Sequence, residues 1–308
     1  MMYPRIVYCA WSIGKFVLLA AAMAGLLWLV AGKAKADEQP PFPLNAQSVL
    51  VIDAETGEKI IEKNAEDIRS IASITKLMTA VVILDARLDL EEEIVITQED
   101  VEATRADSGT SRSLPVGAKL TRAELLHLAL MNSQNRAAAA LARTYPGGVD
   151  VFVGAMNHKA QMIGMYSTKY VDSIGLRNDN VSTATDLAIL VRHSSDYVLV
   201  KDFSTSTQFE MTTYSKKRAK KVGFGTTNGL VRKPDWTIEV QKTGYIKDAG
   251  RCVVMMTSMG VKKVIVVLLN AISNEARAAD ASNIKHWVET GEAPKKPAPP
   301  KKPIKKRK

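Results

Sequence analysis

Three short motifs with the residue types of a serine acyl-transfer site occur in order along the chain. They are S-x-x-K at 73–76, S-x-N at 133–135 and K-T-G at 242–244. A serine hydroxyl becomes a nucleophile when a base lies beside it, and lysine is the only basic side chain in the first motif. The ordered set therefore predicts covalent catalysis by Ser73.

The first motif pairs the nucleophile with its base on one helix. Lys76 follows Ser73 by three residues, so on a helix both side chains project from the same face, with Ser73 in the first turn near the positive end of the helix dipole. Lys76 can act as general base only if its pKa falls from about 10.4. Burial and a second cation would lower it, and Lys242 is the expected second cation.

The other two motifs supply groups that position the substrate and move protons. We expect Asn135 to hold Lys76 and a substrate amide, and Ser133 to relay a proton to the leaving amine. Lys242 and Thr243 would bind a substrate carboxylate, and Gly244 would let the substrate backbone approach. The backbone N–H groups of Ser73 and Tyr245 would form the oxyanion hole.

Other catalytic chemistries find little support in the sequence. The four histidines lack a metal-site spacing such as H-E-x-x-H, and no G-x-S-x-G elbow occurs, so we expect neither a metal ion nor a cofactor. The histidines are His127, His158, His193 and His286. Cys252 is expected to be a small apolar strand residue.

The periodicity of apolar residues predicts the elements that carry these motifs. Apolar and polar residues alternate on both sides of Glu55-Thr56-Gly57, which predicts a β-hairpin over 48–63. From Ser73 to Asp85 the apolar residues recur at helical spacing, which predicts a helix. A capping box at Thr121 opens a helix through Met131. We expect further helices at 135–144, 151–165, 185–196 and 274–289, and strands at 238–242, 251–259 and 263–270.

Strands near both ends of the chain, with helices between them, predict an α+β fold. One antiparallel sheet would form from the two ends, and the helical block would be inserted as a second lobe. The sheet lobe would comprise 37–70 and 197–293, the helical lobe 71–196, and the site would lie in a cleft between them.

The charge of the chain is concentrated at its ends. Forty-two Lys and Arg against 32 Asp and Glu give +10 over 308 residues, but residues 37–293 hold 30 basic and 32 acidic residues. The composition is that of a globular protein, with 46% hydrophobic residues. A nearly neutral body argues against a nucleic-acid-binding face.

The two ends have the features of an export signal and an unstructured tail. Residues 1–36 combine Arg5 and Lys15 with an apolar run over 16–30 and the small-x-small sequence AKA before Asp37, which predicts a signal peptide and a periplasmic location. An uncleaved anchor is the alternative. Residues 294–308 (PKKPAPPKKPIKKRK) predict a disordered basic tail, either simply solvated or weakly attracted to membranes or anionic wall polymers.

The motifs and the sequence around them resemble the low-molecular-mass penicillin-binding proteins, which are serine D-alanyl-D-alanine peptidases. The similarity spans about 45–290 and includes SIASITKLMTA at 70–80, DSIGL at 172–176, STATDLA at 182–188, TNGLVR at 227–232 and KTGYI at 242–246. SQNRA at 133–137, AGRCVVM at 249–255 and the lack of a second C-terminal domain resemble the type 7 endopeptidase branch most.

This resemblance implies a β-lactamase/transpeptidase-like fold, with an antiparallel sheet flanked by helices. It also implies hydrolysis of D-alanyl-meso-diaminopimelate cross-bridges in peptidoglycan through an acyl-enzyme on Ser73, a role in cell-wall biogenesis and cell shape, and acylation by β-lactam antibiotics. Gln134 replaces the Asp of S-D-N, and no Glu-x-x-Leu-Asn stretch is present, which argues against a β-lactamase. A D-alanyl-D-alanine carboxypeptidase and a non-hydrolytic muropeptide or β-lactam sensor remain as alternatives.

Overall fold

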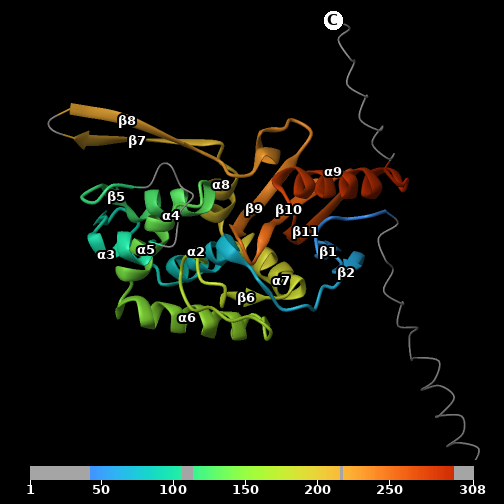
Figure 1. The fold of residues 1–308 in the computed structure, drawn as a ribbon, viewed down its shortest axis with the longest axis horizontal. Helices are drawn as coiled ribbons and strands as arrows, with labels where there is room; N and C mark the ends of the chain where they lie inside the picture. The colour runs from blue at the N-terminus through green and yellow to red at the C-terminus, as the bar shows by residue number, and fades with distance from the viewer. Residues whose placement is uncertain (1–41, 106–113, 216–217, 295–308) are drawn as a thin grey trace, which may run out of the picture. The chain divides into compact units, whose positions relative to one another are not determined.

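The computed structural model describes residues 42–105, 114–215 and 218–294, drawn in colour in Figure 1. The expected signal peptide at 1–36 and nearly all of the expected tail at 294–308 lie outside these ranges. Within them, no helix has both the length and the apolar character needed to cross a bilayer.

A five-stranded antiparallel sheet forms the centre of the molecule, with strand order β2-β1-β11-β10-β9. The strands are β1 (Ser48–Asp53), β2 (Lys59–Lys63), β9 (Thr237–Ile246), β10 (Gly250–Met259) and β11 (Lys262–Ala271). β1 pairs with β11, with Ser48 opposite Leu269, so the sheet joins the two ends of the chain as expected. β9 lies at one edge of this sheet and, among the strands that the structure describes, pairs with β10 only.

Both faces of the sheet are buried, and the two-residue period of the strands separates them. In β11, Val264 and Val266 belong to one apolar cluster, and Ile265 and Val267 belong to the other. The first cluster lies under α9 (Asn274–Thr290), which packs on β10 and β11 (Figure 1). The second contains the buried residues of the helices on the opposite face.

The remaining helices follow the predicted order, with additional short elements. The helices are α2 (Thr75–Asp85), α3 (Gln98–Ala103), α4 (Arg122–Met131), α5 (Asn135–Arg143), α6 (Gly148–Met162), α7 (Ala184–Ser194) and α8 (Val198–Thr205), with 3-10 turns η1 (Ala72–Ile74) and η2 (Gly229–Arg232). The short strands are β3 (Arg69–Ser70), β4 (Glu93–Val95), β5 (Lys119–Thr121) and β6 (Val181–Ser182). The capping box of α4 is confirmed, because Thr121 Oγ1 accepts from the N–H of Glu124 at 3.2 Å.

A two-stranded hairpin departs from the expected plan. β7 (Gln208–Ser215) and β8 (Arg218–Gly225) pair only with each other and project away from the central sheet in Figure 1, and Phe209, Met211 and Phe224 pack against the apolar cluster of the helices. The pattern of apolar residues predicts no helix or strand between 197 and 237, so neither this hairpin nor α8 was predicted.

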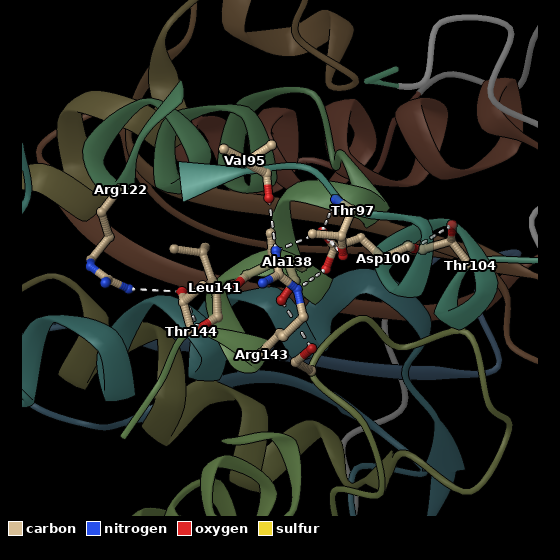
Figure 2. A network of polar contacts seen from close by, with 11 residues as sticks. Val95, Thr97, Asp100, Thr104, Arg122, Ala138, Leu141, Arg143 and Thr144 are labelled. Carbon is tan, nitrogen blue, oxygen red and sulfur yellow. Dashed lines mark hydrogen bonds and ion pairs between the residues drawn. The ribbon is translucent and has the colours of Figure 1, made fainter. Parts of the chain in front are cut away.

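Polar contacts clamp α5 at its C-terminal end (Figure 2). Arg143 Nε and Nη2 each donate to the carboxylate of Asp100 at 2.9 Å, and Nη2 also donates to the carbonyl of Val95. The next residue, Thr144, accepts a hydrogen bond from Arg122 at 3.2 Å. Because α5 begins with Asn135, these contacts fix the helix that positions one of the motif residues.

Candidate active site

The predicted nucleophile and base are in direct contact. Ser73 lies in η1, which continues directly into α2, and Lys76 is one turn further along. Lys76 Nζ lies 2.8 Å from Ser73 Oγ, and the lysine side chain is fully buried. A neutral amine at this distance can accept the hydroxyl proton.

Two oxygen atoms from distant segments hold the Lys76 amine. Its Nζ donates to Asn135 Oδ1 at 2.7 Å and to the carbonyl of Ile174 at 2.7 Å. Asn135 comes from the start of α5, as the S-x-N motif predicts, whereas the Ile174 contact was not predicted. The contact is made by a backbone carbonyl, which every residue type has, so the identity of residue 174 does not reveal it. The only sequence feature that marked this segment was the DSIGL stretch.

The K-T-G residues lie on β9 beside the nucleophile. Thr243 Oγ1 lies 2.6 Å from Thr227 Oγ1. A Cβ atom placed on Gly244 would lie 2.9 Å from the carbonyl oxygen of Ile71 and 3.2 Å from the backbone nitrogen of Ser73, so only glycine lets β9 approach the turn this closely. Tyr245 follows, with half of its surface exposed.

Lys242 is fully buried, and its Nζ donates to the carbonyl of Thr243 at 2.8 Å. Burial lowers its pKa well below 10.5, and the nearby charges of Lys76 and Arg277 lower it further. Two buried amines close together disfavour simultaneous protonation. This electrostatic setting suits a site in which one lysine must accept a proton.

A cleft of about 380 Å³ brings these residues together. Six of the eight predicted site residues line it, and the other two, Lys76 and Lys242, are buried and hydrogen-bond to residues that do. The lining residues are Ser73, Asn132, Ser133, Asn135, Leu176, Thr227, Thr243, Gly244, Tyr245, Arg251, Asn274 and Arg277. Ser133 adopts a left-handed backbone conformation with φ of 62°.

Two arginines also line this cleft, and neither belongs to the three predicted motifs. Arg277 on α9 is 8% exposed and donates from Nη1 to the carbonyl of Cys252 at 3.0 Å. The Arg251 guanidinium stacks 3.4 Å from the centre of the Tyr245 ring. The two arginines give the cleft a positive charge, and the Thr243 hydroxyl adds a hydrogen-bond donor, a combination that suits a substrate carboxylate.

The other reactive residue types lie elsewhere. His127 packs between Phe203 and Phe209, away from the cleft, and Cys252 is buried in β10 with its pKa raised by burial to about 11. Among the residues that the structure describes, no group of three or more His, Cys, Asp or Glu side chains could hold a metal ion.

Comparison with known proteins agrees with this geometry. A protein 41% identical over 255 residues, named D-alanyl-D-alanine endopeptidase, occurs in Pseudomonas aeruginosa, and the match covers 83% of this chain and 81% of that protein. The crystal structure of the Streptomyces K15 DD-transpeptidase matches with a TM-score of 0.74 and 27% identity over 81% of this chain and 98% of that one.

A further solved structure, penicillin-binding protein D2 of Listeria monocytogenes in its cefotaxime-bound form, has a TM-score of 0.67 and 28% identity, covering 80% of this chain and 98% of that one. The antiparallel sheet with flanking helices is therefore the fold that the sequence predicted. The family model of peptidase S11, described as D-alanyl-D-alanine carboxypeptidase, matches residues 33–273. The chain belongs to this family of serine D-alanyl-D-alanine peptidases.

Proposed function

We propose that this protein is a D,D-endopeptidase that hydrolyses D-alanyl-meso-diaminopimelate cross-bridges of peptidoglycan through an acyl-enzyme on Ser73. The observation that carries this proposal is the 2.8 Å contact between Lys76 Nζ and Ser73 Oγ, where Ser73 lines a cleft beside the edge strand β9. The name of the Pseudomonas aeruginosa relative favours the endopeptidase reaction over the other reactions of the family.

The site residues divide the acylation step between them. Lys76 takes the proton of Ser73 as Oγ bonds to the D-alanyl carbonyl carbon, and the N–H groups of Ser73 and Tyr245 stabilise the oxyanion. As the C–N bond breaks, Ser133 gives its hydroxyl proton to the leaving amine and receives the proton held by Lys76, which leaves Lys76 neutral again. Water then hydrolyses the ester, with Lys76 again as base, and restores the free Ser73 hydroxyl.

Acylation by a β-lactam tests the nucleophile directly. Intact-protein mass after incubation with benzylpenicillin should show one stoichiometric adduct, and Ser73→Ala should show none. The cefotaxime-bound relative supports this choice of probe. Absence of an adduct on the folded protein would favour the non-hydrolytic sensor.

The substrate is tested separately, because the family description names a carboxypeptidase. A digest of the cross-linked muropeptide dimer alongside the pentapeptide monomer should show cleavage of the dimer. Loss of D-alanine from the monomer alone would assign the carboxypeptidase reaction instead.

A location outside the cytoplasm follows from this substrate, and the sequence of residues 1–36 supports a periplasmic one. The N-terminal sequence of the protein from the producing cells should begin at Asp37. The basic tail is proposed to add weak attraction to anionic lipids or wall polymers. Sedimentation with anionic vesicles or sacculi should weaken as salt rises, and equal binding by a chain that ends at Glu292 would exclude this role for the tail.

A further inference from the structure

A second cavity of about 380 Å³ adjoins the catalytic cleft on the α9 side of the sheet. The two share Thr227, Asn274 and Arg277 in their walls, so they are neighbouring parts of one surface depression. Val253, which pairs with Thr243 across β9 and β10, also lines the second cavity. The cavity therefore begins beside Thr243.

The order of groups along β9 determines which part of a substrate would enter this cavity. A carboxylate held by Thr243 and Arg277 belongs to the leaving residue, and the carbonyl under attack lies at the N–H of Tyr245. The acyl half of the substrate then continues along β9 in the direction from Thr243 to Tyr245 and beyond. The peptide attached to the leaving residue must extend in the opposite direction, past Thr243 and into the second cavity.

Apolar and polar side chains both line the second cavity, and the charged ones among them carry both signs. Lys233 and Glu275 both line it, and both are exposed. Asn228, which also lines it, is 2% exposed, and its Oδ1 accepts from the N–H of Leu230 at 3.2 Å. Its Nδ2 has no hydrogen-bond partner among the described residues, and a buried amide in that state favours a polar ligand.

The two candidate substrates of this family differ in what they would place there. A pentapeptide releases D-alanine, whose methyl group leaves the second cavity empty. A cross-bridge releases diaminopimelate, whose long side chain leads to a second stem peptide with amides and carboxylates. Only the second leaving group offers partners for Asn228, Lys233 and Glu275.

We infer that this second cavity is the subsite for the stem peptide that carries the leaving diaminopimelate residue, and that it sets the preference for cross-linked substrate. The inference rests on the proposed endopeptidase function. It assigns the preference to residues outside the three motifs.

Filling the cavity with a bulky side chain tests this assignment. Ala278 on α9 lines the second cavity, so Ala278→Phe should lower the ratio of dimer cleavage to pentapeptide cleavage at least about tenfold, both measured as kcat/KM. Penicillin acylation and thermal unfolding are measured on the same samples. Ala279→Phe is the matched control, because Ala279 is exposed on the same helix and does not line the cavity; its ratio should stay at the wild-type value.

A charge reversal provides a second test that leaves packing unaltered. Lys233→Glu on the exposed rim should lower the same ratio roughly threefold or more, and added salt should reduce this effect. An unchanged ratio in both Ala278→Phe and Lys233→Glu, with dimer cleavage by the wild-type protein intact, would overturn the inference alone. A wild-type protein that cleaves the pentapeptide and leaves the dimer whole would overturn the proposed function as well.

Discussion

At the scale of one residue, Lys242 lowers the stability of the folded protein and serves the reaction of the site. Its amine is fully buried, and its pKa is lowered by burial, by Lys76 and by Arg277, so the charged form is disfavoured in the folded protein. Sites of this kind are kept for function at a thermodynamic cost.

Lys242→Met should therefore stabilise the fold and abolish acylation. Methionine fills a similar volume without a charge, and we expect a gain of about 1 to 4 kcal/mol in the free energy of unfolding at neutral pH. Between its lowered folded pKa and 10.5, the unfolded wild-type chain binds more protons than the folded one, so wild-type stability rises with pH. The advantage of the variant should consequently shrink as pH rises toward 10.5.

Urea unfolding of both proteins at several pH values measures this advantage, and penicillin adduct formation measures the lost chemistry. A variant less stable than wild type at neutral pH would contradict the electrostatic argument. An advantage that grows with pH would contradict the direction of the pKa shift.

The sequence could predict those site residues whose types recur at fixed spacings. Ser73 in η1 and Lys76 in α2 lie on consecutive turns of one helical segment, and K-T-G is one strand segment, so local geometry follows from local sequence. Arg277 has no such signature, because its place beside Thr243 depends on how α9 packs across the sheet. The Ile174 carbonyl is equally hidden, since it acts through the backbone.

At the scale of elements, one glycine determines how closely the 172–176 loop packs against the nucleophile turn. Gly175 has φ of +79°, and a Cβ atom there would lie 2.0 Å from the carbonyl oxygen of Ala72. Asp172 Oδ1 accepts from the N–H groups of Ile174 and Gly175, which folds the loop so that Ile174 reaches Lys76.

Gly175→Ala should displace this loop and impair acylation as well as stability. A positive φ alone costs an alanine about 1 to 2 kcal/mol, and the backbone clash adds to it. Gly164→Ala is the matched control, because Gly164 has φ of +90° with nothing within 4 Å of its Cβ position. Thermal unfolding and the acylation rate are measured for both variants. The control shows the cost of a positive φ alone, and the additional loss in Gly175→Ala shows the cost of the clash with Ala72. Equal losses of stability and acylation rate in the two variants would show that the close approach to Ala72 is unimportant.

Elements in which apolar residues recur with a clear helical or strand period were predicted from the sequence. Short strands that exist only because they pair with a segment distant in the sequence were not. The buried strands β10 and β11 and the capped helix α4 carry apolar runs or capping residues. β4 and β5 have three residues each and exist through pairing with one another across 24 or more positions. The β7–β8 hairpin was missed because the basic run 216–221 (KKRAKK) shows no alternation of apolar and polar residues.

At the scale of the whole molecule, a buried carboxylate joins the first described residues to the last helix. Asp280 on α9 is fully buried and accepts from the N–H and side-chain Nδ2 of Asn45, each at 3.0 Å, and from the N–H of Ala46 at 2.8 Å. These contacts span 234 or more positions in sequence. They reinforce the β1–β11 pairing that closes the sheet between the two ends of the chain.

Asp280→Asn should weaken this closure without touching the catalytic cleft. The amide group keeps one acceptor oxygen and turns an N–H₂ group toward a former donor, so at least one buried hydrogen bond is lost and one donor remains unsatisfied. We expect the free energy of unfolding to fall by about 1 to 3 kcal/mol in urea. Asp235→Asn, at an exposed carboxylate, should change the free energy of unfolding by less than about 0.5 kcal/mol.

Because Asp280 does not line the cleft, penicillin acylation of the folded Asp280→Asn variant should proceed at the wild-type rate. Equal stability of the two variants would show that β1–β11 pairing alone holds the ends together, whereas slowed acylation would show that strain at this junction reaches the edge strand β9.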